Sequence, residues 1–276
     1  MYSFQEFQDL THRWEFVLTA ATLYTISVKL ANLSRPSAPA AFTKTSTFKW
    51  LCVLHNSILA LYSAWTFLSA VPILHKRFSD TNIPTIERIC CSNRQIFDDG
   101  LERLTYFFYL SKFYEVIDTV IILVKGKKSP LLQTYHHAGA MITMFAGSKY
   151  RATPIWLFVT FNSFIHSIMY VYYVFSALKL PFPRALKKSL TTMQISQFII
   201  GGSSAAAYFV MKPENMTACL PDFGAKLATS LTLAYLTPLT TLFVQFFVNE
   251  YRKPKPVKTA VQRAEAAVNA SLKSRA

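Results

Sequence analysis

The sequence predicts an all-α integral membrane protein with seven transmembrane helices. Of the 276 residues, 52% are hydrophobic and 15% are aromatic, and only 7 are glycine. The mean hydropathy is positive, at +0.26. Seven apolar stretches approach the roughly 20 residues that a helix needs to span a bilayer. Such a composition is typical of helical membrane proteins.

The apolar stretches follow one another with short connections. In chain order they are Glu15 to Leu33, Trp50 to Leu74, Leu104 to Val124, Leu131 to Gly147, Thr153 to Leu178, Leu190 to Met211 and Ala225 to Val248. We expect residues 1–250 to form one membrane domain. Residues 251–276 are basic and rich in Lys, Pro and Ala, which predicts a disordered cytosolic tail. No positively charged leader precedes a short apolar core, so no cleavable signal peptide is predicted.

The basic residues are unevenly distributed over the predicted loops. With seven spans, the loops at 34–48, 125–130 and 179–188 lie on the same side as the tail, and together they contain 16 of the 29 Lys and Arg. The opposite side contains 8. The positive-inside rule therefore predicts a cytosolic C-terminus and a lumenal N-terminus. This bias also accounts for the net charge of +15, so we expect no nucleic-acid partner.

Two of the loops predicted to be lumenal contain cysteine. Cys90 and Cys91 lie in one loop and Cys219 in the other, whereas Cys52 falls in the second apolar stretch. A disulfide between Cys219 and either Cys90 or Cys91 would suit an oxidising compartment. Four free thiols are the alternative.

The third apolar stretch contains charged residues, in the segment SKFYEVIDT from Ser111 to Thr119. A charged side chain at the centre of a bilayer costs at least about 2.5 to 3.5 kcal/mol, so these groups need partners or a wet cavity. Lys112, Glu115, Asp118 and Thr119 are spaced at i, i+3, i+6 and i+7, which predicts that they share one helix face. Structural ion pairing is the alternative to a functional site.

Three further stretches have polar residues at helical spacing. They are Gln133, His136 and His137 in the fourth, Asn162, His166, Met169, Tyr170 and Tyr173 in the fifth, and Thr191, Gln194 and Gln197 in the sixth. Each group alone could serve helix packing. Together, two acids, a base, three histidines and several amides exceed what packing requires. The pattern predicts one shared polar interior.

The histidines favour nucleophilic chemistry over metal binding. The chain has only six histidines, too few for a membrane di-iron centre. His136 and His137 point about 100° apart on a helix, which does not suit one metal ion shared with His166. In a dry cavity, however, a neutral imidazole can attack a thioester. His136 or His166 could be the nucleophile, and the other the acid–base partner or oxyanion donor.

Four motifs resemble those of the ELO-type very-long-chain fatty acid elongases. KFYEVIDT resembles KxxExxDT, QTYHH resembles HxxHH, HSIMYVYY resembles HxxMYxYY, and TTMQISQ contains TxxQxxQ. The order and spacing match over roughly residues 50 to 250. The run from KFYEVIDT through LLQTYHHAGAMITM is most similar to fungal members that extend acyl chains of about sixteen to eighteen carbons. One departure is Gln133, where the family usually has His.

The resemblance implies a 3-ketoacyl-CoA synthase of the endoplasmic reticulum, with six of its seven helices surrounding a closed acyl-chain tunnel. It would join a long-chain acyl-CoA to malonyl-CoA and release CO₂ and CoA, without a metal or other cofactor. His136 would accept the acyl group, His166 would face it, and His137, Asp118 and Asn162 would complete the catalytic set. The residues expected to bind substrate or shape the cavity are Lys112, Glu115, Gln133, Tyr170, Gln194 and Gln197.

Cationic loops on the predicted cytosolic side could bind the phosphates of CoA. The candidates are Lys127, Lys128, Lys187 and Lys188. The resemblance also implies reductase and dehydratase partners, and a homodimer is a further expectation. The alternative function is a non-catalytic seven-helix protein that binds acyl-CoA or lipid. A receptor would place its polar residues at a lumenal mouth, whereas the charges here extend toward the cytosolic side.

Overall fold

A computed structural model describes residues 3–34, 38–80, 95–211, 219–220 and 222–252. Within these ranges the regular structure is helical, without strands. The elements are α1 (Phe4–Thr11), α2 (Trp14–Leu33), η1 (Ala41–Lys44), α3 (Ser46–Phe78), η3 (Phe97–Leu101), α4 (Glu102–Tyr114), α5 (Val116–Val124), α6 (Leu131–Lys149), α7 (Ile155–Ala177), α8 (Arg184–Ala207), α9 (Phe223–Phe247) and η4 (Val248–Arg252). The all-α prediction is confirmed.

Several helices are long and apolar enough to cross a membrane, as expected of a multi-pass membrane protein. By length and hydropathy, the described residues contain four such helices, namely α2, α3, α7 and the continuous α9–η4 segment. The other three predicted stretches correspond to α4 with α5, to α6 and to α8. The number of seven spans stays a prediction. The predicted tail lies almost entirely outside the described residues.

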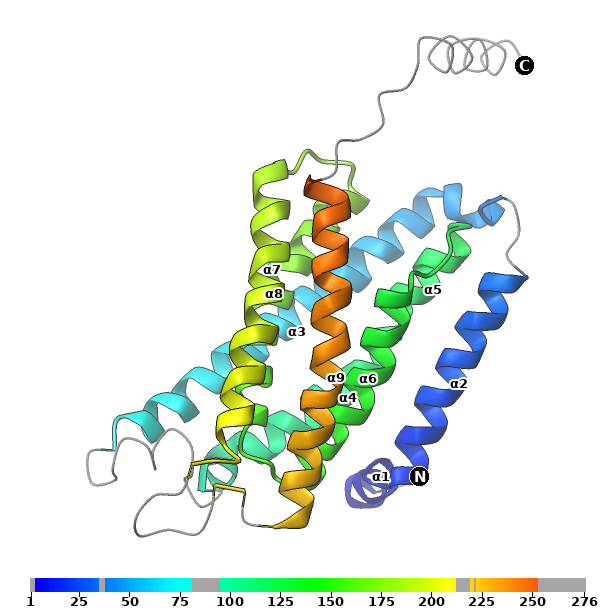
Figure 1. The fold of residues 1–276 in the computed structure, drawn as a ribbon. Coiled ribbons are helices and arrows are strands. Elements are labelled where there is room, and N and C mark those ends of the chain that lie inside the picture. Colours follow the sequence, from blue (N-terminus) through cyan, green and yellow to red (C-terminus); the bar gives the residue numbers. More distant parts are fainter. Residues whose placement is uncertain (1–2, 35–37, 81–94, 212–218, 221, 253–276) are drawn as a thin grey trace, which may run out of the picture.

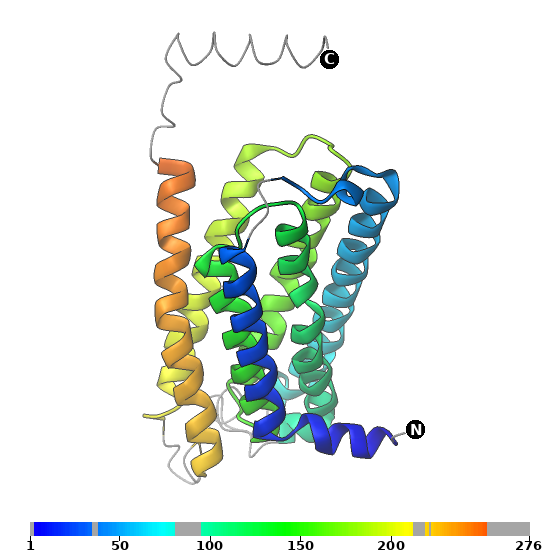
Figure 2. The ribbon, with the colours of Figure 1, turned by 90° about the vertical axis from the view of Figure 1, so that its right-hand side faces the viewer.

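The helices form one bundle (Figures 1 and 2). The last turns of α2, α5, α7 and α9 lie at one end of the bundle, and α1 and the first turn of α4 lie at the other. The connections that follow α5 and α7, two of those predicted to share a side with the tail, are therefore at the same end. Which end faces the cytosol stays a prediction.

The α3 helix is strongly tilted and packs along α7 over most of its length (Figure 1). Its inward face includes Leu59 and His55, both buried. Its outward face exposes large apolar side chains such as Leu61 (72% exposed) and Leu68 (66% exposed). This division is expected of a helix with lipid on one side and protein on the other.

The third predicted span is interrupted at Glu115, where α4 ends and α5 begins. The Asp118 backbone N–H donates to the Glu115 carbonyl three residues back, at 3.1 Å, which tightens the turn. The four polar residues of this group are therefore divided between two helices, and the Thr119 hydroxyl contacts the Tyr24 hydroxyl of α2 at 2.9 Å. That all four share one face stays a prediction.

The short helix α1 was not predicted, although its sequence contains a start signal. The Ser3 hydroxyl accepts from the Glu6 N–H, and the Glu6 carboxylate accepts from the Ser3 N–H. This reciprocal capping box is encoded by Ser followed three residues later by Glu. Burial of Thr11 beneath α4 then fixes the far end of α1.

The cysteine expectation is resolved in part. Cys219 is disulfide-bonded, whereas Cys52 is a buried free thiol. The two remaining cysteines, Cys90 and Cys91, lie outside the described residues.

Candidate active site

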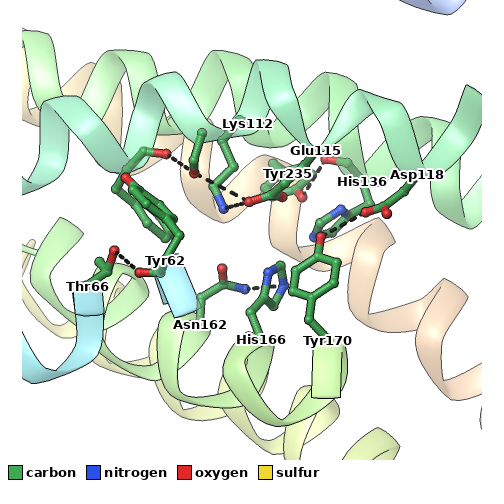
Figure 3. A network of polar contacts seen from close by, with 12 residues as sticks. Tyr62, Thr66, Lys112, Glu115, Asp118, His136, Asn162, His166, Tyr170 and Tyr235 are labelled. Atoms are coloured by element: carbon green, nitrogen blue, oxygen red, sulfur yellow. Dashed lines mark hydrogen bonds and ion pairs between the residues drawn. The ribbon is translucent and has the colours of Figure 1, made fainter. Parts of the chain in front are cut away.

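A buried ion pair lies in the interior of the bundle (Figure 3). The Lys112 ammonium donates to Glu115 Oε1 at 2.6 Å, and both side chains are nearly inaccessible. The ammonium also lies 3.9 Å from the ring centroid of Phe108, a cation–π contact. Glu115 Oε2 is buried without a hydrogen-bond partner. The pair therefore fixes the positions of its two charged groups. It leaves one carboxylate oxygen of Glu115 able to accept a further hydrogen bond.

Asp118 joins three helices through its two carboxylate oxygens. His55 Nε2 of α3 donates to Oδ1 at 2.9 Å, and the Tyr170 hydroxyl of α7 donates to Oδ2 at 2.8 Å. Sequence reasoning missed His55, because it lies with Asn56 and Ser57 in an apolar stretch and these three consecutive residues do not recur at helical spacing. Its signal was that an ionisable residue inside a membrane span needs a partner.

His136 and His166 approach each other across the interior. Their ring centroids lie 6.3 Å apart. The Asn162 amide donates to His166 Nε2 at 3.1 Å, and the Tyr170 ring packs edge-on against His166. Asn162 and Tyr170 therefore orient His166 from one turn before and one turn after it on α7. Figure 3 shows these residues converging with His136 and the ion pair.

His137 turns away from this group, toward α2. Its ring is nearly perpendicular to that of His136 (83°) and packs against Tyr24. Gln133, one turn earlier, places its amide nitrogen 2.8 Å from His137 Nε2. Gln133 thus orients a histidine by hydrogen bonding although it replaces the usual His. The polar residues of α6 consequently lie on two faces of the helix, with Gln133 and His137 on one and His136 on the other.

A small cavity of about 40 Å³ connects several predicted site residues. Lys112, His136, Asn162 and Gln197 contribute to its wall, as does Tyr235 of α9, which the sequence did not indicate. Pockets that hold small molecules typically measure about 300 to 1,000 Å³. This cavity is too small to hold a long acyl chain, and the acyl-chain tunnel stays a prediction.

Other predicted residues lie outside the group. The Gln194 amide contacts Met169 Sδ at 3.4 Å, between α8 and α7. Lys127 and Lys128 are exposed in the connection after α5. Lys187 lies over the Tyr172 ring and Lys188 over the Phe247 ring. The four lysines are thus at the end of the bundle, and their role stays a prediction.

The arrangement is suited to acyl-transfer chemistry. It places the buried imidazole of His166, the half-buried imidazole of His136, an ammonium group and several amide donors around one interior. Gln197 Oε1, like Glu115 Oε2, is buried without a partner. Over the described ranges, no cluster of three or more His, Cys, Asp and Glu side chains is arranged to hold a metal ion. Preorganised donors of this kind can stabilise an oxyanion or enolate.

The chain is similar to known proteins over most of its length. Residues 9–259 match the model of the ELO (GNS1/SUR4) family. Fatty acid elongase A of Dictyostelium discoideum is 32% identical, over 75% of this chain and 73% of the relative. Fatty acid elongase 2 of Trypanosoma brucei brucei is 28% identical, over 74% of this chain and 75% of the relative. Very long chain fatty acid elongase 6 of Drosophila melanogaster is 29% identical, over 61% and 53%. The motifs, the helical membrane fold and these similarities establish that the chain belongs to the ELO family.

Proposed function

We propose that this protein is the condensing enzyme of fatty acid elongation. It joins a long-chain acyl-CoA, of about sixteen to eighteen carbons by resemblance, to malonyl-CoA. The products are a 3-ketoacyl-CoA two carbons longer, CO₂ and CoA. The observation that carries the proposal is the approach of His136 and His166 beside the buried Lys112–Glu115 pair, in a chain of the ELO family.

The first half-reaction transfers the acyl group to His136. One ring nitrogen of the neutral imidazole attacks the thioester carbonyl, and the carbon–sulfur bond breaks. The thiolate leaves and takes the proton that the imidazole ring carried, which gives CoA and a neutral acyl-imidazole. His136 is half-buried at the cavity and has no carboxylate hydrogen-bonded to its ring. The Asn162 amide and the Lys112 ammonium are donors that line the same cavity, where the tetrahedral oxyanion would form.

The second half-reaction forms the carbon–carbon bond. Loss of CO₂ from malonyl-CoA leaves an enolate, whose carbon attacks the acyl carbonyl on His136. The new carbon–carbon bond forms as the carbon–nitrogen bond breaks, and the departing imidazole takes up one proton from solvent, which returns His136 to its starting form. His166 lies opposite His136 and is held by Asn162. It is therefore the residue we assign to orienting the malonyl unit and donating to its enolate oxygen.

The remaining expectations follow from family membership and charge. Lys127, Lys128, Lys187 and Lys188 would bind the phosphates of CoA at the cytosolic end of the bundle. The chain would reside in the endoplasmic reticulum membrane with a lumenal N-terminus, and the product would pass to the reductases and dehydratase of the cycle. These assignments rest on the resemblance and on the positive-inside rule.

The direct test is elongation by the purified protein. Labelled malonyl-CoA and acyl-CoAs of several lengths are supplied, and the products are identified by mass. We expect a 3-ketoacyl-CoA two carbons longer from the parent and from His75→Ala, a control that alters an exposed histidine at the end of α3. We expect none from folded His136→Ala. Near-normal turnover by His136→Ala would contradict the nucleophile. No product from a folded parent that binds acyl-CoA would favour the non-catalytic alternative.

A further inference from the structure

Tyr235 of α9 contacts the segment of α6 that holds His136, and it belongs to none of the four motifs. Its hydroxyl donates to the His136 backbone carbonyl at 3.0 Å, and its side chain contributes to the wall of the cavity. Figure 3 shows this bond beside the Lys112–Glu115 pair. The contact links residues 99 positions apart in the chain, so only the fold reveals it.

A second tyrosine completes the contact in the opposite direction. The Tyr135 hydroxyl of α6 donates to the Tyr235 backbone carbonyl at 3.3 Å. The two rings lie nearly parallel, with an angle of 25° and centroids 5.6 Å apart. Each helix thus donates a tyrosine hydroxyl to the backbone of the other. Two such bonds and a stacked pair fix both the separation and the rotation of the two helices.

Gly139 permits this close approach. It lies one turn after His136, and a Cβ built there would come within 2.2 Å of the Tyr235 ring. Real Cβ atoms do not approach a ring atom so closely, so any larger residue must displace the ring. Because the ring lies against α6 at Gly139, its hydroxyl reaches the His136 carbonyl. Glycine in a helix interior is otherwise less favourable than alanine.

Packing alone does not explain the Tyr235 hydroxyl. The His136 carbonyl lies inside α6, where it can already accept a bond from the helix backbone. An added interhelical bond of this kind contributes little to stability inside membranes. Its position matters more, because a displacement of about 1 Å at a reacting group can slow a reaction by about 100-fold.

We propose that Tyr235 is a positioning residue for His136, and that Gly139 is the glycine that lets Tyr235 perform this role. The hydroxyl holds the backbone at His136, so that the imidazole meets the thioester carbonyl at the cavity. This inference rests on the proposed acyl transfer to His136. It assigns a role in the reaction to α9, which carries no elongase motif.

The test compares two tyrosine-to-phenylalanine changes that are chemically matched. Tyr235→Phe removes the bond to the His136 carbonyl, and Tyr109→Phe removes an equivalent bond to the Thr11 carbonyl (2.9 Å), at a side chain that does not line the cavity. Single-turnover mixing with acyl-CoA alone gives the rate of acyl-enzyme formation. Titration gives the acyl-CoA affinity, and thermal unfolding in detergent gives the stability.

We expect Tyr235→Phe to acylate at least about tenfold more slowly than the parent, with unchanged acyl-CoA affinity. We expect Tyr109→Phe to acylate at the parent rate and to lose as much or more thermal stability. Equal acylation rates in the two variants would overturn the positioning role. A parent that forms no acyl-enzyme would instead overturn the proposed function.

A second comparison distinguishes an effect on positioning from an effect of misfolding. Gly139→Ala should slow acylation strongly in the parent, because the new Cβ displaces the ring. In a Tyr235→Ala background the same glycine change meets no ring, and we expect no further loss. An equal loss in both backgrounds would show that Gly139 acts independently of Tyr235 and would overturn the inference.

Discussion

Two buried polar clusters in this protein differ in how completely their groups are paired. The first, here called the α1–α4 cluster, contains Thr11, Tyr106 and Tyr109 and lies at the end of the bundle near α1. The Thr11 hydroxyl contacts the Tyr106 hydroxyl at 2.9 Å, and the Tyr109 hydroxyl donates to the Thr11 carbonyl at 2.9 Å. No side-chain donor or acceptor of these three residues is left unpaired.

The second cluster is the candidate site, and its pairing is incomplete. Glu115 Oε2 and Gln197 Oε1 are buried without hydrogen-bond partners, and so are His137 Nδ1 and His55 Nδ1. Buried polar groups in proteins are almost always paired, because each unpaired one costs about 1 to 3 kcal/mol. A fully paired cluster indicates a structural role. Open acceptors beside two histidines are available to hydrogen-bond a bound molecule, as the proposed function requires.

The largest expected effect concerns the Lys112–Glu115 pair. Lys112→Met or Glu115→Leu alone leaves an uncompensated buried charge, so we expect each to destabilise the protein by about 3 to 5 kcal/mol. The double variant removes both charges and should be more stable than either single one, yet inactive. Thermal unfolding in detergent and product formation measure the two effects. Normal turnover by the double variant would show that the pair has only a structural role.

A smaller effect is expected when one uncharged polar residue is replaced in each cluster. Gln197→Leu removes a buried amide with an unpaired oxygen, so we expect stability to be kept or raised while turnover falls about tenfold. Thr11→Val should do the reverse, with stability lower by about 1 kcal/mol and turnover unchanged. Comparing unfolding midpoints with initial rates tests both. The same response in both variants would remove the distinction between the clusters.

The smallest effect is a pH dependence next to the α1–α4 cluster. Burial lowers the pKa of His12, and the charge of Lys149 lowers it further. The pKa of His12 in the folded protein lies below its ordinary value of 6.5. The full contribution of neutral His12 to stability is therefore present above pH 6.5. This contribution is lost as the pH falls through the folded pKa. Unfolding midpoints between pH 8 and pH 5 should fall less in His12→Gln than in the parent. Identical pH profiles would exclude His12 as the cause.

The sequence predicts the fold well because a bilayer permits few backbone structures. Backbone polar groups must pair internally within a bilayer, so apolar stretches of sufficient length become helices. The break at Glu115 escaped prediction because neither glycine nor proline marks it. The helix α8 begins at Arg184, earlier than the apolar stretch at Leu190, because polar residues can continue a helix beyond the bilayer.

The candidate site could be predicted where polar residues recur along one helix. Helical spacing identified Lys112, Glu115, Asn162 and His166, which the structure brings into one interior. His55 and Tyr235 lie in apolar stretches outside the four motifs, and each contacts a helix far away in the chain. Their positions depend on which helices pack together, and spacing along one helix contains no such information.

The most direct test of the account is whether acyl-CoA alone modifies His136. The purified protein is mixed with acyl-CoA in the absence of malonyl-CoA, quenched, and examined by intact-protein and peptide mass spectrometry. We predict a mass increase of one acyl group on the peptide containing His136, which disappears when malonyl-CoA is added and is absent from His136→Ala. A parent that elongates acyl-CoA without an adduct at His136, or with the adduct on another residue, would contradict the account.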